Sequence, residues 1–563
     1  MYTPLMMPAV FPVTCHTDFV GPGSIFVAIE GYADNGINYI QQAIEKGART
    51  IVVRQNTVFD DALREFINER NVIVEYVVNT RKALALLSAR EAGYPAQKLS
   101  IVGITGTKGK TTTSFLLEHI MWSTGYKTAL ISSAQNRICG YNFPAPLTTP
   151  QPDYLQQFLK LCVENNVDYV IMEIAAQALT LYRVEGIVLC GIIFTNFSHE
   201  HLEFYATLDD YFQAKCLIFA MAAENAPILV NEDNEWCARL FALYMHAIGY
   251  GFGQRIVCPL SDKLLFLKKS INTQKFFSRA RLKPNLHFVL IGYPLEGTEN
   301  GSKGLYSSAR RNPSTRPSPR LRRAGGCLLL SNVEASGRAQ RENYYRGIHL
   351  SDSVTGINFQ ITYQKTSIAI VRSKLFGEYN AYNVLAAVSM ALELNENVSV
   401  MQHALQTFTG VPGRLQEHVL ANGARCFIDY AHNPESFQAV LSTLRLLTDH
   451  LIVIFGAGGG RDRSKRPLMG EIAAQIADSV IITSDNPRLE DPSIIADDII
   501  HGIPAHMRYK VMQDLDRKKA IEQACFLSDQ GSIIALLGKG PDEYQIIGKT
   551  KYYFSERAIL EKL

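Results

Sequence analysis

The sequence predicts an α/β protein with three domains, because strand-like and helix-like segments alternate along it and a glycine-rich turn joins one strand to a helix. A chain of 563 residues is too long for one core. At roughly 150 residues per domain, this length suggests three or four domains. Hydrophobic residues make up 47% and charged residues 19% of the chain, which is typical of a globular protein with several cores.

Apolar runs of strand length, separated by segments of helical periodicity, divide the chain into three expected domains at residues 1–98, 99–408 and 409–563. The predicted strands lie at residues 25–29, 50–53, 99–104, 128–131, 169–173, 190–195, 425–429, 451–455, 479–483 and 532–537, and the clearest helices at 37–46 and 111–123. This order predicts parallel sheets covered by helices on both faces. The third domain resembles a Rossmann fold in rhythm, although no G-x-G-x-x-G motif follows its strands.

The segment at residues 258–343 breaks this rhythm. It holds 16 Lys and Arg against 5 Asp and Glu, so the remainder of the chain carries a net charge of −8 although the whole stands at +3. We interpret it as a basic, low-complexity insertion in the central domain. A solvated loop is favoured over a nucleic-acid-binding patch for its arginine cluster, which comprises Arg310, Arg311, Arg316, Arg320, Arg322 and Arg323.

The N-terminal residues, the apolar runs and the cysteines indicate the cellular compartment in which the protein is expected. The first 19 residues lack a basic region followed by an apolar one, and no stretch approaches about eighteen uninterrupted apolar residues. The ten cysteines are scattered singly, without a C-x-x-C pair or the spacing of a zinc site. We therefore expect a cytoplasmic protein with reduced thiols and no membrane span.

The clearest chemical motif is the turn at residues 105–112, where an apolar strand gives way to a helix. Backbone N–H groups of such a turn and of the helix N-terminus can bind phosphate oxygens. Lys110 supplies a positive charge for the β and γ phosphates, and Thr111 a hydroxyl for Mg²⁺. Ile104 stands where the strict P-loop spacing has glycine, so the motif is a variant. The alternative is a glycine-rich turn without a ligand.

Glu173 ends the apolar strand predicted at residues 169–173. It is therefore expected at the carboxyl edge of a parallel sheet, where ligands bind. A carboxylate there suits Mg²⁺. A lone glutamate at a strand end is more often solvated, and the phosphate-binding turn upstream favours the metal role.

Ten short motifs occur in the order found in Mur ligases, and the chain resembles that family over nearly its whole length outside the insertion. The motifs lie at residues 106–112, 147–150, 172–173, 194–196, 201–202, 214–215, 380–383, 412–414, 429–434 and 465–470. Within the family, the chain resembles the enzymes that form the tripeptide of the peptidoglycan stem. The resemblance implies a nucleotide-sugar-binding domain, a P-loop ATPase domain and a Rossmann-like domain that delivers the amino acid.

The implied activity is ATP-dependent amide ligation, in which a carboxylate becomes an acyl phosphate and the amine of an amino acid displaces phosphate. The implied substrates are UDP-N-acetylmuramoyl dipeptide, meso-diaminopimelate and ATP, with Mg²⁺ as cofactor, and a monomer is expected. The implied ATP-binding residues are Gly106, Thr107, Lys108, Gly109, Lys110, Thr111, Thr112, Asn383, Arg414 and Asp429. The implied sugar-peptide-binding residues are Thr17, Thr148, Thr149 and Arg183.

The resemblance further implies that Lys110, Glu173, His201 and Lys215 are catalytic, and that Thr111, Glu173, His201 and Lys215 serve the metal. Lys215 aligns with the carbamylated lysine of the family. A carbamate replaces a cation by an anion beside Mg²⁺ and so permits a second metal. Taken alone, a lysine in this helix is typical of a solvated surface, so its role rests on the resemblance.

The residues implied for diaminopimelate are Arg461, Asp485, Asn486, Pro487, Arg488, Gly538 and Asp542. Diaminopimelate differs from lysine chiefly by a second carboxylate, which an arginine can hold with two parallel hydrogen bonds. The resemblance assigns that task to Arg488. The alternative is that Asn486-Pro487 forms a plain turn which Arg488 caps.

Several residues depart from the family pattern. Ala175, Ala176 and Gln177 stand where Ser-Ser-His is usual, and Leu181 stands where glutamine is frequent. Thr17 replaces a serine, and residues 199–205 read His-Glu-His-Leu-Glu-Phe-Tyr for Arg-Asp-His-Leu-Asp-Tyr-His. Pro541-Asp542 replaces His-Glu, so either Asp542 or Glu543 is expected to hold the amine of the amino acid. The ATP-binding motifs are thus intact, whereas the sugar-peptide motifs are altered.

Other assignments stay open. One is a ligase that adds lysine or another amino acid, or a folylpolyglutamate-type synthetase. Another is a nucleic-acid-binding protein on a degenerate ligase scaffold. The second is disfavoured because a scaffold without phosphate chemistry has no physical need for the whole set of Lys110, Glu173, His201, Lys215 and Arg414.

Overall fold

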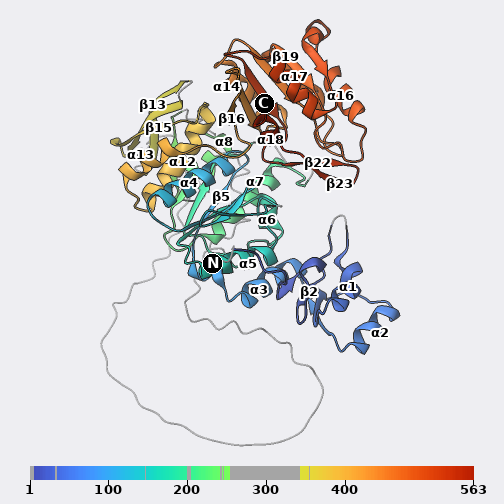
Figure 1. The fold of residues 1–563 in the computed structure, drawn as a ribbon. Helices are drawn as coiled ribbons and strands as arrows, with labels where there is room; N and C mark the ends of the chain where they lie inside the picture. The colour runs from blue at the N-terminus through green and yellow to red at the C-terminus, as the bar shows by residue number, and fades with distance from the viewer. Residues whose placement is uncertain are drawn as a thin grey trace, which may run out of the picture. The chain divides into compact units, whose positions relative to one another are not determined.

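The computed structural model describes residues 5–31, 34–145, 147–198, 204–240, 244, 246–253, 343–353 and 356–563. In these residues the chain forms three α/β domains, each built on its own sheet (Figure 1). Apart from Asn343, the predicted insertion lies outside the described residues. None of the helices in the described ranges is both long and apolar enough to cross a membrane.

The N-terminal domain has a parallel four-stranded sheet, in the order β1-β2-β3-β4. Its elements are β1 (Val13–Thr14), η1 (Thr17–Phe19), β2 (Ile25–Val27), η2 (Gly36–Tyr39), α1 (Ile40–Glu45), β3 (Thr50–Arg54), α2 (Asp61–Glu69), β4 (Ile73–Val77), α3 (Thr80–Glu91) and η3 (Pro95–Lys98). The apolar residues Phe26, Ile51 and Val53 are buried in its core. The expected strand–helix–strand order at the start of the chain is confirmed.

The central domain has an eleven-stranded sheet in its described part, in the order β15-β14-β13-β12-β11-β10-β5-β9-β6-β7-β8. Its strands are β5 (Ser100–Thr105), β6 (Thr128–Ile131), β7 (Asn136–Ile138), β8 (Tyr141–Phe143), β9 (Tyr169–Glu173), β10 (Gly191–Phe194), β11 (Ile228–Asn231), β12 (Ile248–Gly251), β13 (Tyr344–Ser353), β14 (Gly356–Tyr363) and β15 (Thr366–Ser373). Strands β10, β5, β9 and β6 are parallel, so their carboxyl ends share one edge. That edge receives the residues which follow β5, β9 and β10.

Helices of the central domain cover two separate apolar cores. They are α4 (Lys110–Ser123), α5 (Pro152–Glu164), α6 (Ala176–Thr180), α7 (Leu208–Cys216), η4 (Leu217–Met221), α8 (Glu235–Ala238), α12 (Glu378–Glu393) and α13 (Val398–Thr407). One core includes residues of α5, α6 and α7, and the other includes residues of α4, α12 and α13. Helix α4 also packs against α12. Because alternate residues of β5 enter the two cores, the strand before the glycine-rich turn is buried on both faces.

The C-terminal domain has a six-stranded sheet, in the order β16-β17-β21-β18-β19-β20. Its elements are β16 (Gln416–Val419), β17 (Arg425–Asp429), α14 (Pro434–Arg445), β18 (Leu451–Phe455), α15 (Lys465–Ile476), β19 (Ser479–Ile482), α16 (Pro492–His501), η5 (Ala505–Lys510), β20 (Val511–Gln513), α17 (Arg517–Leu527), β21 (Ile533–Leu537), β22 (Tyr544–Ile547), β23 (Thr550–Tyr553) and α18 (Glu556–Leu560). Only β16 runs antiparallel to its neighbour in this sheet. Strands β22 and β23 form a separate hairpin.

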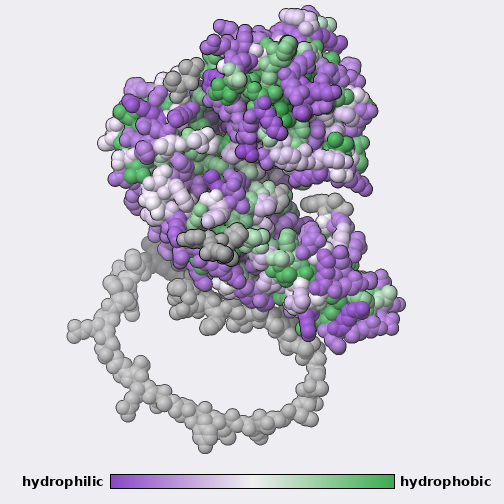
Figure 2. Space-filling model, in the orientation of Figure 1, coloured by the Kyte–Doolittle hydropathy of each residue, from purple (hydrophilic) through white to green (hydrophobic). Residues whose placement is uncertain are grey.

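The α/β fold class is confirmed, and each predicted strand corresponds to an observed strand whose ends differ by two residues or fewer. The strands that were not predicted are β1, β4, β7, β8, β11 to β16, β20, β22 and β23. The face of the molecule in Figure 2 is largely polar, with hydrophobic residues in small patches. This distribution follows because the apolar strand residues are buried in the cores.

Candidate active site

The glycine-rich turn between β5 and α4 forms the centre of the site. Gly106 has φ +142° and Gly109 has φ +80°, conformations that favour glycine. A Cβ at Gly106 would lie 2.0 Å from Thr195 Oγ1, and one at Gly109 would lie 2.3 Å from Asn383 Oδ1. Both glycines are therefore required by backbone conformation and by close packing.

The segment after β10 braces this turn through hydrogen bonds. Thr195 Oγ1 donates to the carbonyl of Lys108 (2.6 Å), and Asn196 Oδ1 accepts from Lys108 N (2.8 Å). Thr107 N donates to the carbonyl of Asn196 (2.9 Å). The backbone of the turn is thus fixed by the neighbouring strand of the same sheet.

Two lysine ammonium groups lie against the turn. Lys110 Nζ donates to the carbonyls of Gly106 and Thr107, both at 3.0 Å. Lys215 Nζ donates to the carbonyl of Gly106 at 2.7 Å and lies 4.6 Å from the ring centroid of Tyr211. Lys215 is only 1% exposed, so the interpretation of Lys215 as a surface lysine is wrong. His201 lies outside the described residues.

Glu173 and Thr111 place two oxygen donors side by side. Glu173 Oε2 accepts from Thr111 Oγ1 (3.2 Å), and Glu173 Oε1 accepts from Ser133 N (3.0 Å). Burial raises the pKa of Glu173, while the charges of Lys110 and Arg414 oppose that rise. Within the described ranges, no group of three or more His, Cys, Asp or Glu side chains is arranged so that it could hold a metal ion. The described candidates for the metal site are therefore the Glu173 carboxylate and the Thr111 hydroxyl. Both are hard oxygen donors, which Mg²⁺ prefers.

Asn383, Arg414 and Asp429 lie on three further segments. Asn383 Oδ1 accepts from Thr113 Oγ1 (3.3 Å), which ties α12 to α4. Asp429 accepts from Leu415 N and from Ala431 N, both at 2.8 Å, and burial raises its pKa while Arg414 opposes the rise. The charge of Arg414 thus opposes the rise in pKa of both Glu173 and Asp429.

Thr149 and Arg183 meet beside Glu173, whereas Thr17 belongs to a different element. Thr149 Oγ1 donates to the carbonyl of Glu173 (2.9 Å), and Arg183 Nη1 donates to the carbonyl of Thr149 (3.0 Å). Arg183 Nε is buried and has no partner. Thr148 is half-buried, and the carbonyl of Thr17, in η1, accepts from Lys46 Nζ (2.9 Å).

The residues predicted to hold an amino acid gather at the carboxyl edge of the C-terminal sheet, after β18, β19 and β21. Arg488 Nη1 donates to the carbonyl of Gly459 (3.0 Å). A Cβ at Gly458 would lie 3.0 Å from Arg488 Nη1 and 3.6 Å from Arg461 Cγ. The two arginines therefore flank one short loop. Pro487 and Asn486 precede Arg488 and are buried.

Asp485, Gly538 and Asp542 lie together on the same edge. A Cβ at Gly538 would lie 3.0 Å from Asp485 Oδ2. Burial raises the pKa of Asp542, and the charge of Lys539 opposes the rise. Glu543, the alternative carboxylate, accepts instead from Ser555 Oγ (2.9 Å) and pairs with Arg557 (3.2 Å). Asp542 is thus the carboxylate that lies near Asp485 and Lys539.

Lys539 is a residue that sequence reasoning missed. It is fully buried, and its Nζ lies 3.3 Å from Asp485 Oδ1. The available signal was its place in the Gly-Lys-Gly turn directly after β21, at the edge where ligands bind.

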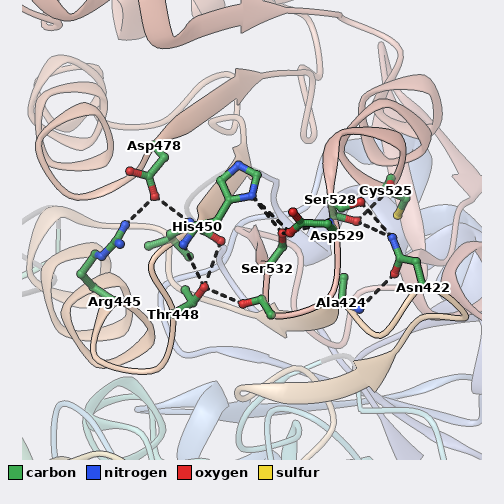
Figure 3. Close-up of polar contacts among 12 residues, drawn as sticks. Asn422, Ala424, Arg445, Thr448, His450, Asp478, Cys525, Ser528, Asp529 and Ser532 are labelled. Atoms are coloured by element: carbon green, nitrogen blue, oxygen red, sulfur yellow. Dashed lines mark hydrogen bonds and ion pairs between the residues drawn. The ribbon is translucent and has the colours of Figure 1, made fainter.

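A Ser-His-Asp group lies elsewhere in the C-terminal domain, at the amino ends of β18 and β21 (Figure 3). His450 Nδ1 and Ser532 Oγ are 2.9 Å apart. Ser532 Oγ also donates to the Asp529 carboxylate and accepts from Asp529 N (2.9 Å), and Ser532 is 1% exposed. In a hydrolytic triad the serine and the aspartate meet opposite ring nitrogens of the histidine, whereas here both lie near His450 Nδ1. The group therefore ties a loop together and does not form a nucleophile.

Comparisons with known proteins agree with this geometry. Family models match residues 12–92 (Mur ligase family, catalytic domain), 104–289 (Mur ligase middle domain) and 413–540 (Mur ligase, glutamate ligase domain). A relative from Clostridium botulinum, UDP-N-acetylmuramoyl-L-alanyl-D-glutamate–2,6-diaminopimelate ligase, is 30% identical over 97% of this chain and 93% of its own. The ligase of the same name from Aquifex aeolicus is 32% identical over 98% and 93%.

Solved structures show the same fold. A structure of a UDP-N-acetylmuramoyl-L-alanyl-D-glutamate–2,6-diaminopimelate ligase superposes with a TM-score of 0.56 at 22% identity and covers 98% of this chain and 94% of its own. The match spans all three domains. On the family matches and these full-length relatives, the chain belongs to the Mur ligase family.

Proposed function

We propose that this chain is an ATP-dependent ligase that adds meso-diaminopimelate to UDP-N-acetylmuramoyl-L-alanyl-D-glutamate. The observation that carries the proposal is the gathering of Lys110, Lys215, Thr111 and Glu173 around one glycine-rich turn. The relatives that match nearly the whole chain bear the name of this ligase. Because the nucleotide substrates are made inside the cell, we place the reaction in the cytoplasm.

The turn is proposed to bind the phosphates of ATP. Its two glycines allow the positive φ values of the turn and its close packing against Thr195 and Asn383, and the N-terminus of α4 adds a favourable dipole. Lys110 then neutralises charge on the phosphates, and Asn383 and Asp429 are proposed to contact the nucleotide. Arg414 is proposed to reach the same nucleotide from the C-terminal domain.

Thr111 and Glu173 are proposed to hold Mg²⁺, and their adjacent oxygens fit a hard divalent cation. When bound, Mg²⁺ neutralises charge that develops on the transferred phosphoryl group. Burial raises the pKa of Glu173, and the charges of Lys110 and Arg414 oppose that rise and so favour the carboxylate form. Lys215, as a carbamate, and His201 are proposed as further groups of the metal site.

The incoming amino acid is proposed to lie against the loop at residues 485–488. Arg488 would hold its distal carboxylate with help from Arg461, since a guanidinium can form two parallel hydrogen bonds with a carboxylate. Asp485 and Asp542 would hold the amino groups. Pro541 stands where histidine is usual, and because Glu543 pairs with Arg557, Asp542 is the carboxylate of this turn that we assign to the task.

The sugar peptide is proposed to bind through Thr17, Thr148, Thr149 and Arg183. The unpartnered buried Nε of Arg183 is suited to a substrate carboxylate. Ala175 and Ala176 cannot supply the hydroxyls that are usual in the family, so this side of the site depends more on Arg183 and the two threonines.

The proposal is tested by measuring phosphate release with the nucleotide-sugar dipeptide, ATP and a panel of amino acids. Release that requires both the dipeptide and meso-diaminopimelate is the expected result. Release that is independent of the panel, or greatest with glutamate and a folate, would assign the chain to another ligase reaction.

A further inference from the structure

The loop at residues 485–488 is held by the hairpin β22–β23. Arg488 has φ +55°, a left-handed conformation that is uncommon for a residue with a side chain. Its N–H donates to the carbonyl of Ile546 (3.1 Å), and its own carbonyl accepts from Gly548 N (2.7 Å). These bonds form an isolated parallel bridge between Arg488 and Ile547. The hairpin therefore fixes the backbone from which the Arg488 guanidinium extends.

Lys539 is the second group that holds this loop. Its side chain is 0% exposed, and its Nζ lies 3.3 Å from Asp485 Oδ1 and 3.4 Å from Asn486 Oδ1. The ring centroids of Tyr544 and Phe554 lie 5.9 and 5.8 Å from the same nitrogen, within the range of cation–π attraction. The ammonium thus sits between the loop and two aromatic rings at the open end of the hairpin.

Asn486 connects the two supports. Its Oδ1 accepts from Lys539 Nζ (3.4 Å) and from Ile546 N (2.9 Å), and Ile546 also bonds to Arg488. Burial lowers the pKa of Lys539, and the Asp485 carboxylate opposes that change. Loss of the ammonium would leave Asp485 buried without this cation and free Asn486 to turn.

A direct role of Lys539 in binding substrate does not agree with its burial. The Lys539 ammonium is already engaged by Asp485 and Asn486 behind the loop, whereas Arg488 is half-buried and presents surface. Any effect of Lys539 on substrate must therefore pass through Asp485, Asn486 and the backbone of Arg488.

We propose that Lys539 is a positioning residue that, together with the hairpin β22–β23, sets the loop at residues 485–488 for selection of a diamino dicarboxylic acid. The inference rests on the proposed function. It assigns selectivity to a buried cation behind the loop as well as to Arg488 on its surface. Tyr544 and Phe554 help to hold the Lys539 ammonium in place, because their rings face it.

The test compares steady-state kinetics of the full chain with Lys539→Met, which removes the charge and keeps side-chain length. The KM for meso-diaminopimelate should rise about tenfold to a hundredfold, since a misplacement of about 1 Å has effects of that order. As this KM rises, the selectivity ratio, which is kcat/KM for diaminopimelate divided by kcat/KM for lysine, should fall. The KM for ATP should stay within about a factor of two, because distant sites act independently.

Two further variants complete the experiment. Phe554→Leu removes one ring and keeps the ammonium, so it should shift the same ratio in the same direction by a smaller factor. Lys518→Met removes a lysine whose side chain is 62% exposed on α17 and should leave every constant unchanged. Thermal unfolding of each variant shows whether it is folded, and Phe554→Leu carries the test if Lys539→Met is not.

An unchanged selectivity ratio in a folded Lys539→Met protein would overturn the inference. So would equal rises in the KM values for ATP and diaminopimelate, because that pattern indicates a general loss of structure. If the wild type shows no diaminopimelate-dependent turnover, the proposed function itself fails, and this result is visible before any variant is compared.

Discussion

At the scale of single residues, the site depends on ionisable groups that are buried and hydrogen-bonded. Lys215 is 1% exposed and Glu173 is 1% exposed, and such groups are retained only where partners stabilise them. Each has a partner at the glycine-rich turn or beside it, Gly106 for Lys215 and Thr111 for Glu173. The burial that makes these groups costly also strengthens their effect on a bound anion or cation.

Lys110→Ala is predicted to lower kcat/KM by an amount equivalent to about 3 to 4 kcal/mol, comparable with the loss of a principal electrostatic donor. The reason is that Lys110 Nζ lies against the turn that is proposed to hold the phosphates. Phosphate release measures the effect, and Lys518→Ala serves as a surface control. Equal activity of the folded variant and the wild type would refute the role of this turn in ATP chemistry.

Glu490→Gln is predicted to destabilise the C-terminal domain in a pH-dependent way. Both oxygens of Glu490 accept from the fully buried Arg466 at 2.8 Å, and these bonds lower its pKa from 4.5 to about 2. The stabilisation is therefore complete above the unfolded pKa and is lost as pH falls through about 2. At pH 7 the variant should lose about 2 kcal/mol of unfolding free energy, after allowance for solvent screening.

Urea unfolding of the wild type and Glu490→Gln, measured from neutral pH down to about pH 3, checks this prediction. The difference between the two should narrow as the pH falls. Glu561→Gln, at a side chain that is 56% exposed, is the control. A difference that stays constant with pH would mean that the carboxylate charge of Glu490 is not what stabilises Arg466.

At the scale of elements, the connection between β12 and β13 limits how the predicted insertion can be shortened. These strands pair in parallel, with Gly249 opposite Tyr344, so the chain must return along the length of the sheet. Crossovers of this kind need about a dozen residues or more. A linker of that length is therefore required in any deletion variant.

Replacement of residues 259–342 by about twelve Gly and Ser residues is predicted to retain fold and phosphate release, because loop length changes closure entropy only slightly. The family match to the middle domain continues to residue 289, so a variant lacking only residues 290–342 is the matched comparison. Activity in the second variant alone would place residues 259–289 in the domain proper. Inactivity of both folded proteins would give the segment a role in catalysis.

Several strands that are buried on both faces could be predicted from sequence, whereas the exposed hairpin β22–β23 could not. Strands β5, β9 and β18 are continuous apolar runs, which local pattern identifies. Strands β22 and β23 are half-buried to exposed throughout and mix tyrosine and lysine with apolar residues, so no alternation marks them. Their pairing is set by the turn at Gly548 and by contact with the loop at residues 485–488.

At the scale of the whole molecule, the meeting of Lys110, Thr111 and Glu173 at one sheet edge was predictable, and the contacts that support them were not. Parallel topology explains why the turn after β5 and Glu173 share that edge. The burial of Lys215, the brace from Thr195 and the contact of Lys539 with Asp485 join residues 54 to 109 positions apart. Such contacts depend on tertiary packing, which local periodicity does not encode.

The central claim is that this chain forms a tripeptide with diaminopimelate, and a competition experiment tests it most directly. The wild type and Arg488→Ala are given UDP-N-acetylmuramoyl-L-alanyl-D-glutamate, ATP and equal amounts of meso-diaminopimelate and lysine. The amounts of the two products are then compared by mass spectrometry. The account predicts that the wild type makes the diaminopimelate product in large excess, since lysine leaves a partly buried arginine unpaired at roughly 2 to 5 kcal/mol. Arg488→Ala should lose most of that excess. A wild type that prefers lysine, or a variant that still prefers diaminopimelate as strongly, would contradict the account.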